Sequence, residues 1–129
     1  MLRSIWTKHD NQWFRSRLEA SWAEAFDAAG VRWNYEPMRF LLGNSLQYSY
    51  LPDFWLSNSL ANDCGCYAEV KPVFPTNEEI NLVKLLAEWT RLSVFFLVGK
   101  PWSPEIYEAW HNGTYCAWQM RTRAHILGV

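Results

Sequence analysis

The stretch that decides the fold is Tyr50–Lys71, YLPDFWLSNSLANDCGCYAEVK, in which two β-type runs flank a polar segment. The first run, residues 48–56, is aromatic and extended, and its Pro52 removes one backbone donor from any ladder. The second run is Cys66–Lys71. Because the segment Ser57–Gly65 between them has turn composition, the two runs predict a β-hairpin.

Alternation along the second run sorts its charged side chains onto one face. Successive side chains of a strand point to opposite faces, so Glu69 and Lys71 project together, while Val70 points into a core and leaves its carbonyl beside Glu69. The hairpin would set Asp53 against Glu69. Two carboxylates and an ammonium at one place predict a site that holds Mg²⁺ beside a phosphodiester.

A third carboxylate is expected from a helix over about Gln12–Ala29. Its apolar residues recur with a helical period, at Phe14, Leu18, Trp22, Ala25, Phe26 and Ala29. Asp10 is the expected N-cap, and Gly30 suits the left-handed position after the last turn. Glu19 lies at the margin of the apolar stripe, where its carboxylate can face a cleft.

Four blocks of the chain together resemble the PD-(D/E)XK nucleases. The blocks are Phe14–Glu19, Gly30–Val31 leading to Tyr35–Glu36, Tyr50–Leu56, and Ala68–Pro72. Their order and spacing are most similar to small phage-type enzymes, including the endonuclease I group of Holliday-junction resolvases. The resemblance extends from about residue 12 to residue 100.

This resemblance implies a mechanism and a fold. It makes Asp53 and Glu69 metal ligands, Glu19 the carboxylate that completes the metal site, and Lys71 the group that orients water or stabilises charge. With the Val70 carbonyl as a further ligand, the expected cofactor is Mg²⁺, for which Mn²⁺ would substitute. The implied fold is α/β, a restriction-endonuclease-like αβββαβ core with a mixed sheet flanked by helices.

Local patterns predict the remaining elements. They are strands over Val31–Glu36, Arg39–Leu42 and Leu46–Tyr50, a helix from the Thr76/Glu79 capping box to about Arg91, a doubly covered strand over Ser93–Val98, a short helix starting at Ser103–Pro104, and a last strand over Tyr115–Met120.

Length and composition predict one domain over residues 1–129. Half of the residues are hydrophobic, which excludes a disordered chain. No apolar run is long enough for a membrane span, and the first ten residues lack the apolar stretch of a signal peptide. We therefore expect no membrane partner and a cytoplasmic location, in a bacterial host cell if the protein is phage-encoded. The three cysteines, an odd number, argue against a disulfide framework.

The net charge of −1 is unusual for a DNA-binding protein. One or two divalent ions would change it to +1 or +3, and basic residues crowd the first forty positions. Arg15 and Arg17 flank the segment that carries Glu19, and Lys84 follows the motif on the next helix, so these three are the expected phosphate contacts. The expected partner is duplex or branched DNA, and a homodimer stays open.

Two other classes of function fit parts of the sequence. One is a nuclease-fold protein that binds nucleic acid or inhibits a protein partner without cutting. The other is a structural or interaction module that docks a partner through its aromatic residues. Trp102, Trp110 and Trp118 offer faces for unpaired bases, although large aromatic residues in a domain of this size are more often core residues.

Overall fold

The computed structural model describes residues 6–57, 65–113 and 116–128, which form a mixed α/β structure around a six-stranded sheet. The sheet strands are β3 (Arg32–Tyr35), β6 (Phe54–Ser57), β7 (Cys66–Lys71), β8 (Val94–Val98), β9 (Glu105–His111) and β10 (Cys116–Arg121). The helices are α1 (Arg17–Ala29), α2 (Asn77–Thr90) and α3 (Ala124–Leu127). Two separate hairpins are formed by β1 (Thr7–His9) with β2 (Gln12–Phe14) and by β4 (Phe40–Leu42) with β5 (Tyr48–Tyr50).

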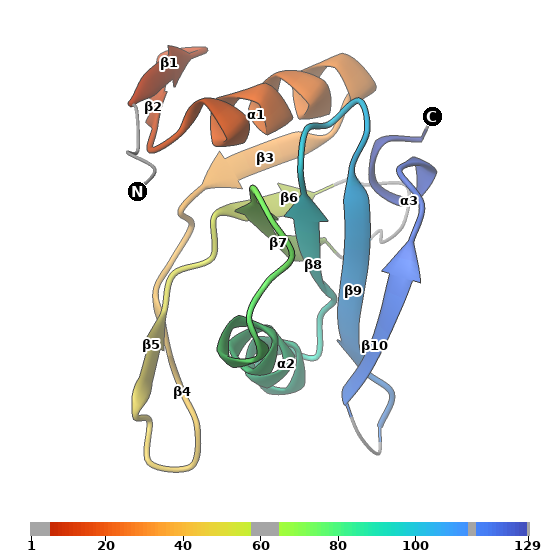
Figure 1. Cartoon of the computed structure of the whole chain (residues 1–129). Helices are drawn as coiled ribbons and strands as arrows, with labels where there is room; N and C mark the ends of the chain where they lie inside the picture. The colour runs from red at the N-terminus through yellow and green to blue at the C-terminus, as the bar shows by residue number, and fades with distance from the viewer. Residues whose placement is uncertain (1–5, 58–64, 114–115, 129) are drawn as a thin grey trace.

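The strand order is β10-β9-β8-β7-β6-β3, and β7 and β8 form the parallel pair in it. Parallel neighbours need a long crossover connection, and α2 supplies it. Helix α2 lies on one face of the sheet and α1 on the other (Figure 1). The β4–β5 hairpin is an excursion between β3 and β6, which pair with each other.

The sheet separates two apolar cores. The core under α1 includes Phe14, Trp22, Phe26, Phe54 and Phe95. The core under α2 includes Val83, Leu86, Val94, Phe96 and Tyr107. All five side chains of β8 are buried, and they alternate between the two cores. The prediction of a strand covered on both faces over residues 93–98 is therefore confirmed.

The predicted first helix begins too early in the sequence. Residues Gln12–Phe14 form strand β2. Ser16 is the N-cap of α1, and its hydroxyl accepts a hydrogen bond from the Glu19 amide. Asp10 is a turn residue rather than a cap. Asp10 and Asn11 both have positive φ, 53° and 64°, as a tight two-residue hairpin turn requires. Phe14 matched the helical period because it does enter the core, but from a strand.

The C-terminal end of α1 and the start of α2 lie where the sequence predicts them. Gly30 has φ 75° after α1, and Thr76 and Glu79 form the predicted capping box of α2. None of the helices in the described ranges is long and apolar enough to cross a membrane.

The short helix predicted from Ser103–Pro104 is wrong, because β9 begins at Glu105. Strand β9 pairs with β8 on one side and β10 on the other, so its backbone groups are satisfied in the extended form. Pro104 precedes the ladder and removes no donor from it. The predicted last strand is present as β10, but the predicted start at Tyr115 and most of the predicted turn Ser57–Gly65 lie outside the described residues.

Candidate active site

The β6–β7 hairpin brings Asp53 and Glu69 together. Phe54 pairs with Ala68, so Asp53 comes opposite Glu69 just beyond the end of the ladder. The Asp53 amide donates to Glu69 Oε1 over 3.1 Å, and the Val70 amide donates to Asp53 Oδ2 over 2.8 Å. Each carboxylate thus accepts a backbone hydrogen bond from the other strand.

Glu19 reaches the same place from α1. It lies in the first turn of the helix with only 7% of its surface exposed, where the helix dipole favours a negative charge. Its Oε1 accepts hydrogen bonds from the Tyr35 hydroxyl over 3.0 Å and from the Ser16 hydroxyl over 3.2 Å. Glu19 lies close enough to Asp53 for its charge to raise the pKa of Asp53. The structure therefore gathers the three carboxylates of the sequence hypothesis at one end of the hairpin.

Crowding and burial make Asp53 and Glu69 hard to ionise. Burial raises the pKa of Asp53 well above its ordinary range, and the neighbouring Glu69 and Glu19 carboxylates raise it further. Burial also raises the pKa of Glu69, to about 7, although Lys71, the Asp53 amide and the Tyr50 hydroxyl favour its charged form. A cation at this place would remove much of that cost.

Lys71 lies next to the carboxylates as an ammonium group. Its Nζ is 3.9 Å from Glu69 Oε2 and forms a closer ion pair with Glu79. Burial works against its charge, but Glu79 and Glu69 outweigh burial and raise the pKa of Lys71. Lys71 is thus suited to act as a positive group rather than as a base.

Three residues at the site were not assigned a role there from the sequence. The Tyr50 hydroxyl donates to Glu69 Oε1 over 3.1 Å, and burial raises the pKa of Tyr50 far enough to keep it a donor. Tyr35 binds Glu19, and Glu79 binds Lys71 in addition to capping α2. In the sequence, Tyr35 and Tyr50 belong to runs of alternating or aromatic residues, which predict strands and not a site. Glu79 is explained by the capping box alone.

The expected phosphate-binding residues are only partly brought to the carboxylates. Arg15 pairs with Glu36 over 2.9 Å, and its amide donates to the Tyr35 hydroxyl over 3.1 Å. Arg17 is exposed at the first position of α1. Lys84 lies instead in a groove between α2 and the β4–β5 hairpin, beside Cys116, and none of the three carboxylates lines that groove.

Comparison of the chain with models of protein families, with curated proteins and with solved structures finds no match.

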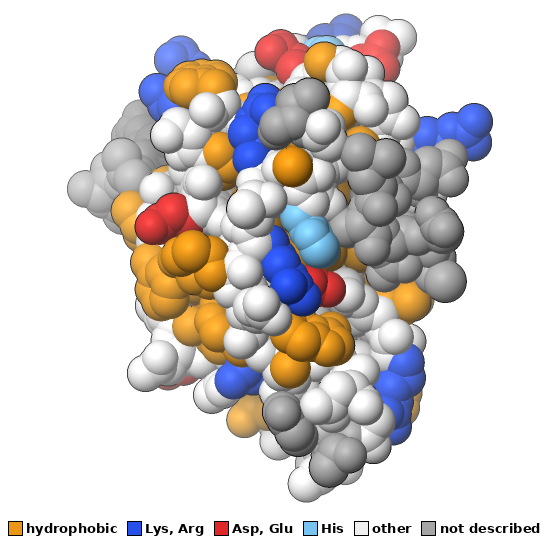
Figure 2. Space-filling model, turned by 90° about the vertical axis from the view of Figure 1, so that its right-hand side faces the viewer, with side chains coloured by type: hydrophobic (Ala, Val, Ile, Leu, Met, Phe, Trp, Pro, Cys, Tyr) orange, Lys and Arg blue, Asp and Glu red, His pale blue; other side chains and the backbone are white. Residues whose placement is uncertain are grey.

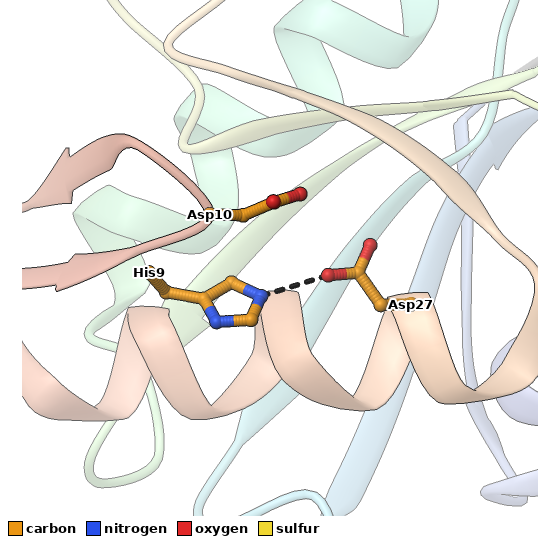
Figure 3. Close-up of side chains that lie close together, drawn as sticks. All are labelled: His9, Asp10 and Asp27. Atoms are coloured by element: carbon orange, nitrogen blue, oxygen red, sulfur yellow. Dashed lines mark hydrogen bonds and ion pairs between the residues drawn. The ribbon is translucent and has the colours of Figure 1, made fainter.

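A different cluster has side-chain atoms spaced closely enough to bind one metal ion. Within the described ranges, His9, Asp10 and Asp27 form the only group of three His, Cys, Asp or Glu residues whose ligand atoms all lie within 4.8 Å of one another (Figure 3). Asp27 binds the His9 ring over 2.7 Å and the Trp33 indole over 2.8 Å, so the cluster fastens the β1–β2 hairpin to α1. The oxygens of Glu19, Asp53 and Glu69 are more widely spread. One ion held by all three would draw at least one of these side chains inward.

Another buried carboxylate, Glu108, lies on β9, two strands away from β7 in the sheet. Glu108 accepts hydrogen bonds from the Ser93 hydroxyl and from Arg121 Nε, the latter over 2.7 Å, and His125 lies 3.6 Å away. Figure 2 shows this side of the molecule, where a histidine, a basic and an acidic side chain meet and the other basic side chains lie apart. Arg121 is thus already neutralised by a protein carboxylate.

Proposed function

We propose that the protein is a metal-dependent endonuclease that hydrolyses DNA phosphodiester bonds. The observation that carries the proposal is the pair of hydrogen bonds across the hairpin, from the Asp53 amide to Glu69 and from the Val70 amide to Asp53, beside the Lys71 ammonium. Partly buried acidic residues with raised pKa values and a cationic neighbour are typical of functional sites.

The residues present fit a hard divalent cation. Carboxylate and carbonyl oxygens are the ligands that Mg²⁺ and Mn²⁺ prefer, and Asp53, Glu69, Glu19 and the Val70 carbonyl would supply them. The Val70 amide donates to Asp53, and the amide and the carbonyl of one strand residue point toward the same neighbour, so the Val70 carbonyl lies on the Asp53 side of β7. A divalent cation would also offset the repulsion that raises the pKa of Asp53.

Each side chain has a role in the proposed reaction. Bound Mg²⁺ would lower the pKa of a water molecule and neutralise charge on the phosphate. Asp53 and Glu69 would hold the cation, and Glu19 would orient a water molecule beside it. Lys71 stays charged, and it would orient the attacking water or stabilise the negative charge that develops on the phosphate. Tyr50 and Glu79 fix Glu69 and Lys71 in position.

We further propose a restriction-endonuclease-like core made of α1, β3, β6, β7, α2 and β8. Their order along the chain is αβββαβ, and the parallel β7–β8 pair with its α2 crossover supports the assignment. The proposed partner is duplex or branched DNA, with phosphates contacted by Arg15 and Arg17. A homodimer stays a prediction.

The test is cleavage by the purified protein and its isosteric variants. Linear, single-stranded, flapped and four-way-junction DNAs are incubated with the protein in Mg²⁺, Mn²⁺ or EDTA. We expect metal-dependent cutting that Asp53→Asn and Glu69→Gln each reduce by about 10³-fold or more, since a ligand of the catalytic metal is lost. Exposed Glu105→Gln is the matched control and should cut normally. Full Mg²⁺-dependent activity in both isosteric variants would rule out this site.

A second candidate is a protein of the same fold that binds nucleic acid without cutting. The wide spread of the Glu19, Asp53 and Glu69 oxygens favours it, because all three already have protein hydrogen-bond partners. Calorimetric titration with Mg²⁺ and Mn²⁺ separates the two functions. Binding that depends on Asp53 supports the nuclease, and DNA binding without any metal binding supports the second candidate.

A further inference from the structure

The β1–β2 hairpin has one face turned toward α1 and one face turned outward. Phe14 is fully buried and His9 contacts Asp27, so these two mark the inner face. Lys8 pairs directly with Trp13 across the hairpin. Because side chains two residues apart share a face of a strand, Trp6 and Arg15 fall on the same outer face as Lys8 and Trp13.

On that outer face, each tryptophan is covered by a cation from the opposite strand. Lys8 Nζ lies 5.9 Å from the centre of the Trp13 ring, and the Arg15 guanidinium lies 5.9 Å from the centre of the Trp6 ring. Trp6 nevertheless keeps 58% of its surface exposed and Trp13 keeps 53%. The two indoles present flat apolar surfaces to solvent, and Lys8 and Arg15 add donors beside them; the Arg15 side chain is 55% exposed and is also paired with Glu36 over 2.9 Å.

This outer face is held firmly and lies close to the carboxylates. Figure 1 shows the hairpin beside α1, and His9 fastens it to Asp27 in the last turn of the helix. The Arg15 amide donates to the Tyr35 hydroxyl, which in turn donates to Glu19. A DNA strand that contacts Arg15 would therefore lie two hydrogen bonds away from Glu19, a residue of the proposed metal site.

We propose that Trp6, Lys8, Trp13 and Arg15 form a platform on which unpaired DNA bases stack. Base stacking on aromatic side chains combined with contacts from basic residues to the backbone is how proteins hold single-stranded nucleic acid. The substrate of the site would then be DNA with a single-stranded part, such as an overhang, a flap or a fork. The cutting of that DNA rests on the proposed function, whereas its binding to the platform does not.

Binding is measured by fluorescence anisotropy in EDTA, where no metal-dependent hydrolysis occurs. The probes are a labelled single-stranded oligonucleotide, the corresponding blunt duplex and an RNA of the same sequence. We expect Trp6→Ala and Trp13→Ala to weaken single-strand binding about 5- to 100-fold each, as expected for one lost stack, with less than about twofold change for the blunt duplex. Trp13→Phe should restore binding and Trp13→Leu should not, because only the former keeps an aromatic face.

The matched control is Trp102→Ala, because Trp102 is also exposed, at 66%, and also lies under a lysine, with Lys100 Nζ 5.3 Å from its ring centre. Normal single-strand binding by the Trp6 and Trp13 variants, an equal loss in the Trp102 variant, or a preference for the RNA would overturn the inference. A platform that binds single strands through Trp6 and Trp13 in a protein that cuts no DNA in Mg²⁺ or Mn²⁺ would support the inference and refute the proposed nuclease. DNA cutting that neither tryptophan substitution affects, with normal single-strand binding, would support the proposed nuclease and refute the platform.

Discussion

Glu69→Gln should stabilise the metal-free protein at alkaline pH. The pKa of Glu69 is raised from its ordinary 4.5 to about 7, mainly by burial, so the folded state binds this proton more tightly than the unfolded chain does. The stabilisation from that proton is fully present below pH 4.5 and is lost as the pH rises through 7. At about 1.4 kcal/mol per pH unit, the wild type should lose about 2–3 kcal/mol of unfolding free energy between pH 5 and pH 8 from this residue.

The neutral Gln side chain removes this loss and keeps an oxygen that can accept from Tyr50 and the Asp53 amide. At pH 8 in EDTA, we expect the variant to gain about 1–3 kcal/mol, or about 3–10 °C in melting temperature for a chain of this size. At pH 5 the gain should nearly vanish.

Urea denaturation at both pH values measures the difference, with exposed Glu105→Gln as the control. Added Mg²⁺ should raise the stability of the wild type at pH 8 more than that of the variant. A variant no more stable than the wild type at pH 8 would show that the Glu69 carboxylate bears no electrostatic cost, and the case for a cation here would fail.

Three further predictions concern the surroundings of the carboxylates. Arg15→Ala and Arg17→Ala should each flatten the plot of log affinity for duplex DNA against log salt by about 0.9. Arg121→Ala and Arg123→Ala should do less, because the Arg121 side chain is only 25% exposed in its pair with Glu108 and Arg123 donates to the Pro101 carbonyl, whereas the Arg15 side chain is 55% exposed in its pair with Glu36. A dominant C-terminal pair would refute this DNA path. Glu79→Gln retains the capping geometry but weakens the ion pair with Lys71, so single-turnover cleavage should slow about tenfold or more with unchanged DNA affinity. Exposed Glu78→Gln is the control, and equal cleavage rates in the two variants would contradict the positioning role of Glu79. Tyr50→Phe removes a donor that favours the charged form of Glu69, so the midpoint of the pH–rate profile at limiting Mg²⁺ should move upward, and an unchanged or lower midpoint would contradict the hydrogen bond.

The hairpin and its carboxylates could be predicted because their signals are local. Pro52 interrupts an aromatic run, so strand β5 ends before it and β6 begins after Asp53. Two-residue alternation then fixed the common face of Glu69 and Lys71, whose side chains lie 3.9 Å apart. The capping box of α2 was equally local, since Thr76 and Glu79 are three residues apart.

The remaining features depend on contacts between distant segments. Glu79 binding to Lys71 and Tyr35 binding to Glu19 require the packed structure, because neither pair shares an element. The N-terminal hairpin was missed because Phe14 suits a helix as well as a strand when only its burial is considered. Strand β9 was missed because Ser103–Pro104 resembles a helix start, while its pairing with β8 and β10 decides otherwise.

The backbone hydrogen bonds that the Asp53 and Glu69 carboxylates accept across the hairpin have a consequence for the evolution of this fold. Glu69 accepts from the Asp53 amide and Asp53 accepts from the Val70 amide, so each acid joins the two sides of the hairpin. Selection for a folded chain alone would therefore favour keeping both acids. Under the proposed function, a descendant that stopped cutting DNA would retain the acids, or drift to Asn and Gln, long after its activity was lost. Among such descendants, the survival of Lys71 beside intact acids would be the better record of catalysis, because in the described part of the hairpin the Lys71 side chain makes ion pairs with Glu69 and Glu79 and holds no backbone group.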